Sequence, residues 1–486
     1  MRSRIIGALL VLTAGTAWHT LTPGLGAQAP QPDRSAIPAV GPAPALKLPA
    51  IQKRRLANGL QVLIVELHEV PVAQVNLTAF SGSADDPAGR FGVASFMTAM
   101  LTEGAGSRSA LEIADAVDFL GASLDASAAI DSSSVRLHAP VARLADALAI
   151  MADVALRPTF PKDELERQRQ QRLTSLLQAR DDAATVAALA FSRVLYGKTH
   201  RFGTAAMGNA ETIKSLTPEQ LRAFYTSVFR PDNSALIVVG DVRPDGVMPL
   251  LEKHFGGWKP QTAAPAAAVL PAATQPEART VFMVDKPGAP QTQIRIGWIG
   301  VSRSTPDYFP LLVTNTILGG AFSSRLNLNL REKNGYTYGA SSSFDMREAP
   351  GPFSSGAGVQ TDKTSEALTE FFNELNGMLK PVPADELARA KNYVALRFPG
   401  GFETSGDISR RLEEMLVYRL PEDYFGRYVR NIEAVTAADV QRVAQQYIAP
   451  GRFAVVVVGD RVTIEPRIKT MNLGPIRVLT PDDIFN

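Results

Sequence analysis

The chain has 486 residues, of which 45% are apolar and 20% are charged, and its formal charge is +2. A chain of this length is too long for one hydrophobic core and predicts several domains of ordinary globular composition. The near-neutral charge without basic runs gives no electrostatic basis for binding nucleic acid or an anionic membrane. The absence of cysteine excludes disulfides, a cysteine nucleophile and a cysteine-linked lipid anchor.

The N-terminal residues 1–29 have the order of a secretory signal peptide. Two arginines precede an apolar run over residues 5–18, and small residues follow at positions 27–29. The apolar run is shorter than the roughly 20 residues that cross a bilayer. We therefore predict cleavage near Gln28, a periplasmic location without a membrane anchor, and a Pro- and Ala-rich leader over residues 30–50.

Residues 51–258 are predicted to form the first of two halves. Apolar runs of strand length and helical periodicity alternate along this half. Strands are expected at 61–66 and 72–81, as a pair, and at 134–138, and helices at 111–120, 141–156 and 163–177. Helices segregated against a largely antiparallel sheet give an α+β sandwich.

A Pro- and Ala-rich linker over residues 259–277 separates two halves that repeat each other. SALIVVGD ends the first half at Asp241, and FAVVVVGD ends the second half at Asp460. The offset of 219 residues continues without a gap into the preceding Pro break and capped amphipathic helix. We therefore predict a duplicated second half over residues 278–460 and a C-terminal tail over residues 461–486.

A helix led by glycine, over residues 92–104, carries a family resemblance. Its frame Gly-Val-Ala-x-Phe-x-x-x-Met-Leu-x-x-Gly resembles the metal-binding helix of the insulinase (pitrilysin) family. Those inverzincins have His-x-x-Glu-His there, two imidazole ligands one turn apart beside a general base. In this chain the three positions are Ser95, Thr98 and Ala99. None of these side chains can bind zinc or activate a water, so we predict no metal in this chain.

Other residues do not replace the lost ligands. The resemblance implies a further Glu ligand near residues 172–178, but no acid occurs from Arg167 to Arg180. The histidines after the signal lie too far apart to form a helical pair of ligands, and structural or solvated roles are expected for them: His68, His138, His200 and His254. The chain also has no nucleophile elbow, phosphate-binding loop or dinucleotide-binding motif.

A segment of the second half keeps residues of another kind. Residues 318–344 closely resemble the part of the insulinase family that reaches the substrate with an Arg and, seven residues later, a Tyr. These positions are Arg331 and Tyr338. A guanidinium can donate hydrogen bonds to peptide carbonyls, and a phenol can stabilise an oxyanion on the scissile carbonyl. Gly319 and Gly320 are expected to let the segment approach the chamber closely.

The resemblance covers residues 51–460 and implies a fold and a function. It implies two α/β roll domains per half, four in all, in a clam-shell half-chamber. In two-chain members of the family one subunit binds zinc and the other bears the Arg/Tyr pair. The chain is similar to that second subunit: inactive alone, without a cofactor, completed by a zinc-bearing homologous partner, and acting on peptides that add a strand to a sheet edge. The alternative is a non-enzymatic scaffold or peptide-binding protein, against which the retained Arg331 and Tyr338 argue.

Overall fold

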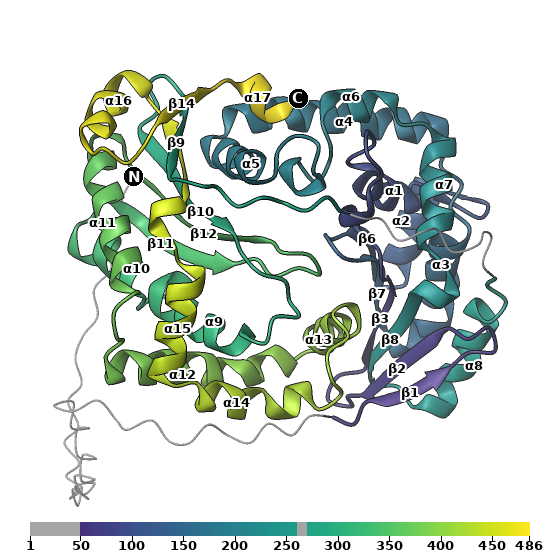
Figure 1. Cartoon of the computed structure of the whole chain (residues 1–486). Helices are drawn as coiled ribbons and strands as arrows, with labels where there is room; N and C mark the ends of the chain where they lie inside the picture. Colours follow the sequence, from purple (N-terminus) through teal and green to yellow (C-terminus); the bar gives the residue numbers. More distant parts are fainter. Residues whose placement is uncertain (1–48, 260–269) are drawn as a thin grey trace, which may run out of the picture. The chain divides into compact units, whose positions relative to one another are not determined.

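The computed structural model of the chain describes residues 49–259 and 270–486 (Figure 1). The predicted signal peptide, nearly all of the predicted leader and residues 260–269 of the predicted linker lie outside the described residues. The described residues belong to one compact unit and contain two six-stranded sheets, one in each half. None of the helices in these ranges has the length and apolar composition of a membrane span.

The first half is built on a sheet with the strand order β1-β2-β8-β3-β7-β6. Its strands are β1 (Gln52–Arg55), β2 (Gln61–Glu66), β3 (Val72–Ala79), β6 (Ser123–Ala128), β7 (Ser133–Pro140) and β8 (Ser234–Gly240). Its helices are α1 (Val93–Leu101), α2 (Ala110–Phe119), α3 (Leu144–Leu156), α4 (Lys162–Asp181), α5 (Ala183–Tyr196), α6 (Ala210–Ser215), α7 (Pro218–Val228) and α8 (Pro244–Phe255). A short pair, β4 (Gly104–Ala105) and β5 (Arg108–Ser109), follows α1.

The predicted direct pairing of β2 with β3 is wrong, because β8 lies between them. Strand β8 runs parallel to β2 and antiparallel to β3. All seven of its residues are buried, and a strand that is covered on both faces belongs in the centre of a sheet. The last strand of the half therefore returns to the middle of the sheet instead of extending its edge.

The second half has the sheet order β11-β12-β10-β13-β9-β14. Its strands are β9 (Thr280–Asp285), β10 (Gln291–Ile299), β11 (Thr337–Phe344), β12 (Pro352–Gln360), β13 (Ala454–Gly459) and β14 (Ile476–Leu479). Its helices are α9 (Tyr308–Asn315), α10 (Arg325–Asn327), α11 (Thr364–Gly377), α12 (Ala384–Arg397), α13 (Ser405–Val417), α14 (Tyr424–Ala434), α15 (Ala437–Tyr447), α16 (Arg461–Thr470) and α17 (Pro481–Phe485). The segment predicted as a C-terminal tail thus forms α16, β14 and α17, and β14 pairs with β9.

The predicted duplication extends well beyond the motifs that suggested it. Helix α7 and helix α15 begin 219 residues apart, at Pro218 and Ala437. Strands β2 and β9 keep the same offset at both ends, and so do the single 3₁₀ turns that precede β8 and β13. A shared spacing across strands, turns and helices is what a duplicated unit produces.

Each half covers the sheet of the other with one helix. Helix α5 of the first half contacts β10 and β13, and helix α13 of the second half contacts β3 and β8 (Figure 1). Phe191 of α5 packs in one cluster with Val456 and Val458, while Leu63 and Val239 of the first sheet pack with residues of α13. The two halves therefore share their hydrophobic cores.

The α+β class and the two sheet-containing halves agree with the prediction. The prediction of four α/β rolls differs from the structure. The described residues contain two six-stranded sheets, one in each half. The physical reason lies in the order of the strands. Strand β8 in the first half and strand β13 in the second half return to the centre of the sheet that the preceding strands form, so each half closes around one sheet.

Candidate functional site

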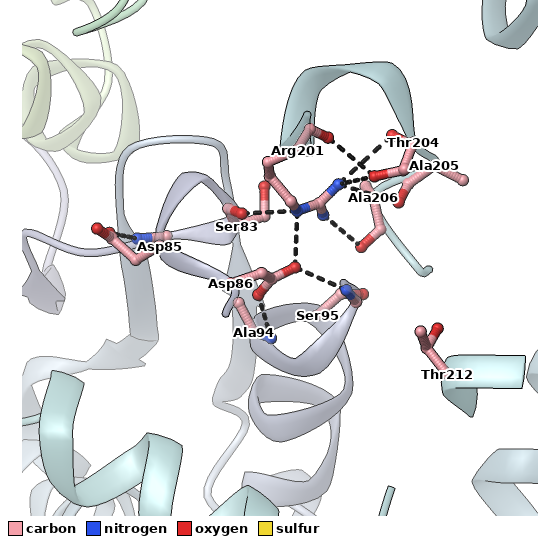
Figure 2. A network of polar contacts seen from close by, with 12 residues as sticks. Ser83, Asp85, Asp86, Ala94, Ser95, Arg201, Thr204, Ala205, Ala206 and Thr212 are labelled. Atoms are coloured by element: carbon pink, nitrogen blue, oxygen red, sulfur yellow. Dashed lines mark hydrogen bonds and ion pairs between the residues drawn. The ribbon is translucent and has the colours of Figure 1, made fainter. Parts of the chain in front are cut away.

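The start of helix α1, whose sequence resembles the metal-binding helix of the insulinase family, is fixed by a buried ion pair (Figure 2). The Asp86 carboxylate accepts hydrogen bonds from the backbone N–H groups of Gly92, at 2.6 Å, and Ala94, at 2.9 Å. Arg201 Nε donates to the same carboxylate at 2.8 Å and to the Ser83 carbonyl at 2.7 Å. The carboxylate side chain is 0% exposed and the guanidinium side chain 4% exposed. This pair satisfies donors that a helix start leaves free.

Helix α1 requires a glycine at the residue that precedes it, Gly92. Its φ is +101°, and an added Cβ would lie 2.3 Å from the carbonyl oxygen of Met207. Only glycine fits both the positive φ and this close approach. The first residue of the sequence frame is therefore explained by packing, independently of any metal.

The three motif positions on α1 have unequal surroundings. Ser95 and Ala99 are half-buried and lie one turn apart, so they share one face of the helix. Thr98 is 1% exposed, and its hydroxyl donates to the Ala94 carbonyl at 3.0 Å. The hydroxyl is thus satisfied within the helix, and the face shared by Ser95 and Ala99 stays partly open.

An arginine from helix α4 lies on that face. Arg172 Nη1 donates to the Ser95 hydroxyl at 3.1 Å, and Nη2 donates to the Ser95 carbonyl at 2.8 Å. Its Cζ lies 4.6 Å from the centroid of the Phe96 ring. Burial lowers the pKa of the Arg172 guanidinium to about 10, which leaves it charged at neutral pH. A cationic side chain therefore occupies the surroundings of the emptied motif.

These residues do not fit a zinc ion. A catalytic zinc site needs three converging protein ligands of the imidazole, thiolate or carboxylate kind, and Ser95, Ala99 and Arg172 offer none. Among residues 49–259 and 270–486, no three His, Cys, Asp or Glu side chains gather in a way that could hold a metal.

The surroundings of three of the histidines differ in burial and in pKa. His200 is buried, its Nδ1 accepts from the Phe202 N–H at 3.0 Å, and burial lowers its pKa. His68 is exposed, and its hydrogen bond to Asp241 raises its pKa. Burial also lowers the pKa of His254. These settings explain the side chains without a ligand.

In the second half, Tyr338 lies on a bulged edge strand. Strand β11 is at the edge of its sheet, and its register with β12 shifts between Thr337 and Ala340. A bulge turns a side chain away from the regular alternation of a strand and is common beside active sites. Tyr338 is 88% exposed, and within the described part of the chain its hydroxyl has no hydrogen-bond partner. The phenol is therefore free to donate to a bound molecule.

Arg331 lies within the π-helical segment η6 (Leu328–Lys333), which precedes this strand. A second π-helical segment, η5 (Thr316–Gly320), lies upstream, and such segments are frequent at functional sites. The Arg331 side chain is 40% exposed, and its Nε lies 3.3 Å from the Glu332 carboxylate. Its Cζ lies 4.7 Å from the ring centroid of Phe322, which is 59% exposed. The guanidinium thus lies over an aromatic ring at cation–π distance, and the side chain stays partly exposed to solvent.

The two glycines differ from each other. Gly319 is buried, and an added Cβ would lie 2.3 Å from the backbone nitrogen of Ser342 on β11. Gly320 is exposed, and an added Cβ would lie 2.7 Å from the Asn315 side chain. Gly319 therefore allows η5 to approach β11 closely, and this approach helps to position the edge strand.

Both halves present an edge strand beside their helical site. Strand β6 is at the edge of the first sheet and contacts α1. Strand β11 is at the edge of the second sheet and contacts η5 and η6. Edge strands have backbone groups that can pair with an extended peptide.

Comparison with known proteins identifies the family. Residues 61–202 match the model of the insulinase family (peptidase family M16), and residues 215–394 match that of the peptidase M16 inactive domain. The chain is an insulinase-family homologue. An uncharacterized zinc protease of Mycobacterium tuberculosis is 26% identical over 424 residues, which cover 87% of this chain and 96% of that protein.

Solved structures agree with the insulinase-family fold. A peptidase M16 inactive domain from Pseudomonas fluorescens superposes with a TM-score of 0.77 and 28% identity, covering 84% of this chain and 98% of that chain. A chain of complex III from Candida albicans has a TM-score of 0.71 at 15% identity, covering 87% of this chain and 99% of that chain. The second likeness concerns the fold alone.

The candidate site includes two residues that the sequence did not single out. Arg172 lies in the stretch where the family resemblance implied a Glu ligand, and its charge was the only signal at that place. Phe322 lies nine residues before Arg331, and nothing in the sequence pattern links the two side chains. Contacts between different elements were needed to find both.

Proposed function

We propose that this chain is the subunit without zinc of a heterodimeric periplasmic zinc metallopeptidase. The observation that carries the proposal is a contrast between the halves. Helix α1 has lost every ligand and has Arg172 beside the lost positions, whereas Arg331 and Tyr338 are exposed next to an edge strand. A zinc-bearing homologue would supply the metal, and this chain would supply groups that bind and orient the peptide.

Tyr338 would act on the reacting carbonyl. Its hydroxyl can donate a hydrogen bond to the oxygen that becomes negative when the carbonyl is attacked. The exposed phenol on the bulge of β11 can be brought to a substrate that a partner holds, because no neighbouring residue in the described ranges occupies its hydroxyl.

Arg331 would hold the peptide backbone. The guanidinium presents several donors in a fixed plane, which suits one or two carbonyl oxygens. Phe322 supports the face of that plane at 4.7 Å, so fewer orientations of the side chain remain to be lost on binding. Such contacts exist in the ground state and in the transition state alike, so they should affect substrate affinity.

An extended peptide would pair with an edge strand. Strands β6 and β11 both end their sheets in the described residues, and backbone pairing supports recognition with little dependence on side chains. Export to the periplasm is the part of the proposal that rests on the charge and apolar pattern of residues 1–29.

Reconstitution with a partner tests the proposal. The mature chain, starting near Gln28, is mixed with a homologue from the same genome that carries His-x-x-Glu-His, and complex formation is followed by gel filtration. We expect a one-to-one complex that cleaves a fluorogenic peptide, with this chain inactive alone. Full activity of the partner by itself, unchanged by this chain, would contradict the proposal and favour the scaffold or peptide-binding alternative.

A further inference from the structure

Helix α1 leaves one face partly uncovered. Seven of its nine residues are buried, and the two that are half-exposed, Ser95 and Ala99, lie one turn apart. Edge strand β6 and helix α4 both contact α1. A peptide added to β6 would therefore run beside the helix that carries this face.

Arg172 brings a positive charge to this face without a counter-charge. Arg201 and Arg303 are buried arginines that each face a carboxylate, Asp86 and Glu414 respectively. Arg172 has no carboxylate within ion-pair distance in the described parts of the chain, and its Nε is buried without an acceptor. Arg172 is half-buried and donates from Nη1 and Nη2 to Ser95, so its Nε is the buried donor that lacks a partner within the described ranges, and such a donor costs free energy. The Arg172 side chain is thus held ready for an anion that the described residues do not supply.

The remaining donors of the site suit a carboxylate. The two hydrogen bonds to Ser95 use two of the five N–H groups of the guanidinium. The Ser95 hydroxyl accepts from Arg172 and keeps its own proton to donate. An arginine fork with a neighbouring hydroxyl matches the two oxygens of a carboxylate.

We propose that Arg172 and Ser95 bind a carboxylate of the peptide, so that the face of α1 that lacks metal ligands selects peptides with an acidic group. The carboxylate comes from an Asp or Glu side chain or from the C-terminus of the peptide. The assignment rests on the proposed function only in requiring that the chain binds peptides, and its test needs no partner subunit.

The test uses the mature chain alone and labelled nine-residue peptides that differ at one place. One peptide has a central Glu and an amidated C-terminus, the second has Gln in place of that Glu, and the third has the Gln and a free C-terminal carboxylate. Dissociation constants are measured by fluorescence anisotropy. We expect the Glu peptide or the free-carboxylate peptide to bind about tenfold more tightly than the neutral one, and the tighter of the two identifies the source of the carboxylate.

Two variants separate this role from a structural one. Arg172→Met keeps an unbranched stem against Phe96 but removes the charge, so acidic and neutral peptides should bind with about equal affinity. The unfolding temperature should stay the same or rise. Arg172→Lys should keep part of the preference, because it retains the charge without the fork. Arg180→Met, which removes a charge from the same helix where Asp482 is its partner at 3.3 Å, should keep the full preference.

Three results would overturn the assignment. They are equal binding of all three peptides by the unsubstituted chain, no measurable binding of any of them, and an acidic preference that survives Arg172→Met. A folded Arg172→Lys chain that shows no acidic preference at all would count against the charge as its source. None of these results depends on Arg331 or Tyr338, so failure here and failure of the proposed function are distinguishable.

Discussion

The two halves of this chain have equivalent helices and strands, but the side chains at the equivalent positions differ in chemistry and exposure. In the first half a regular helix, α1, lies beside edge strand β6, and Arg172 of α4 packs on the half-buried face of α1 that carries Ser95 and Ala99. In the second half helix α9 continues into the π-helical segment η5 beside edge strand β11. Tyr338 is exposed on the bulge of that strand. Duplication supplied the same frame twice. The chemistry of each copy depends on a few side chains and on local departures from regular geometry.

The ion pair that anchors α1 offers the largest expected effect on stability. Asp86→Ala leaves Arg201 buried without its carboxylate, and removal of one partner of a buried pair costs about 3–5 kcal/mol. Urea denaturation of the mature chain measures this loss. Asp385→Ala in the second half is the control, since its pair with Arg389 is exposed and should contribute about 0.3–0.5 kcal/mol. Equal losses for both variants would show that α1 needs no such anchor.

The hydroxyl of Tyr338 offers the largest expected effect on activity. Tyr338→Phe in the reconstituted complex should lower kcat about 10²–10³-fold, as loss of one oxyanion donor typically does. Tyr336→Phe is the matched control, because that half-buried ring packs against the second-half core and loses the same hydroxyl. Both variants should assemble with the partner on gel filtration. A normal kcat for Tyr338→Phe would show that the Tyr338 hydroxyl has no role in the reaction.

Arg331 should show a smaller effect, with a different kinetic signature. Arg331→Ala is expected to raise KM and to lower kcat/KM by about 10–100-fold, because hydrogen bonds to a charged group contribute about 1.5–3 kcal/mol. Arg331→Lys keeps the charge but loses the planar fork and the stacking on Phe322, so it should recover part of the loss. A pure fall in kcat with unchanged KM would instead place Arg331 on the reacting carbonyl.

Restoring the ligands tests whether Arg172 opposes a metal in the first half. The triple change Ser95→His, Thr98→Glu and Ala99→His supplies the motif but leaves a guanidinium next to residue 95. We expect zinc binding that tightens about tenfold or more when Arg172→Glu is added, because a cation is replaced by a carboxylate ligand. Competition with a chromophoric chelator measures both affinities. Equal affinities would mean that Arg172 lies too far from the metal position to affect it.

The sequence predicted the repeated elements well, for a physical reason. Capped helices and fully apolar strands carry local signals, and the spacing from Gly240 to Gly459 fixed the repeat before any contact was known. The place of β8 in the middle of its sheet was missed. Sequence-adjacent strands usually pair, and only the complete burial of β8 on both faces argues otherwise.

The sequence named the residues of the candidate site but not their surroundings, and their role stays a prediction. The sequence placed Ser95, Arg331 and Tyr338 in their motifs, because motif spacing is a local property. It could not reveal that Arg172 reaches Ser95 across 77 positions of chain, or that Phe322 supports Arg331. Such contacts depend on how helices pack, which periodicity does not encode.

The exchange of α5 and α13 between the sheets has a consequence for how the molecule is made. One face of the first sheet, with Leu63, Val65 and Val239, is covered by residues that include Ile408 and Leu412 of α13. During synthesis this apolar face has no cover until more than 300 further residues have followed β2. Contacts this distant in sequence form slowly and leave apolar surface exposed to aggregation. We therefore expect a fragment that ends before α13 to leave this apolar face uncovered and to aggregate more readily than the whole chain.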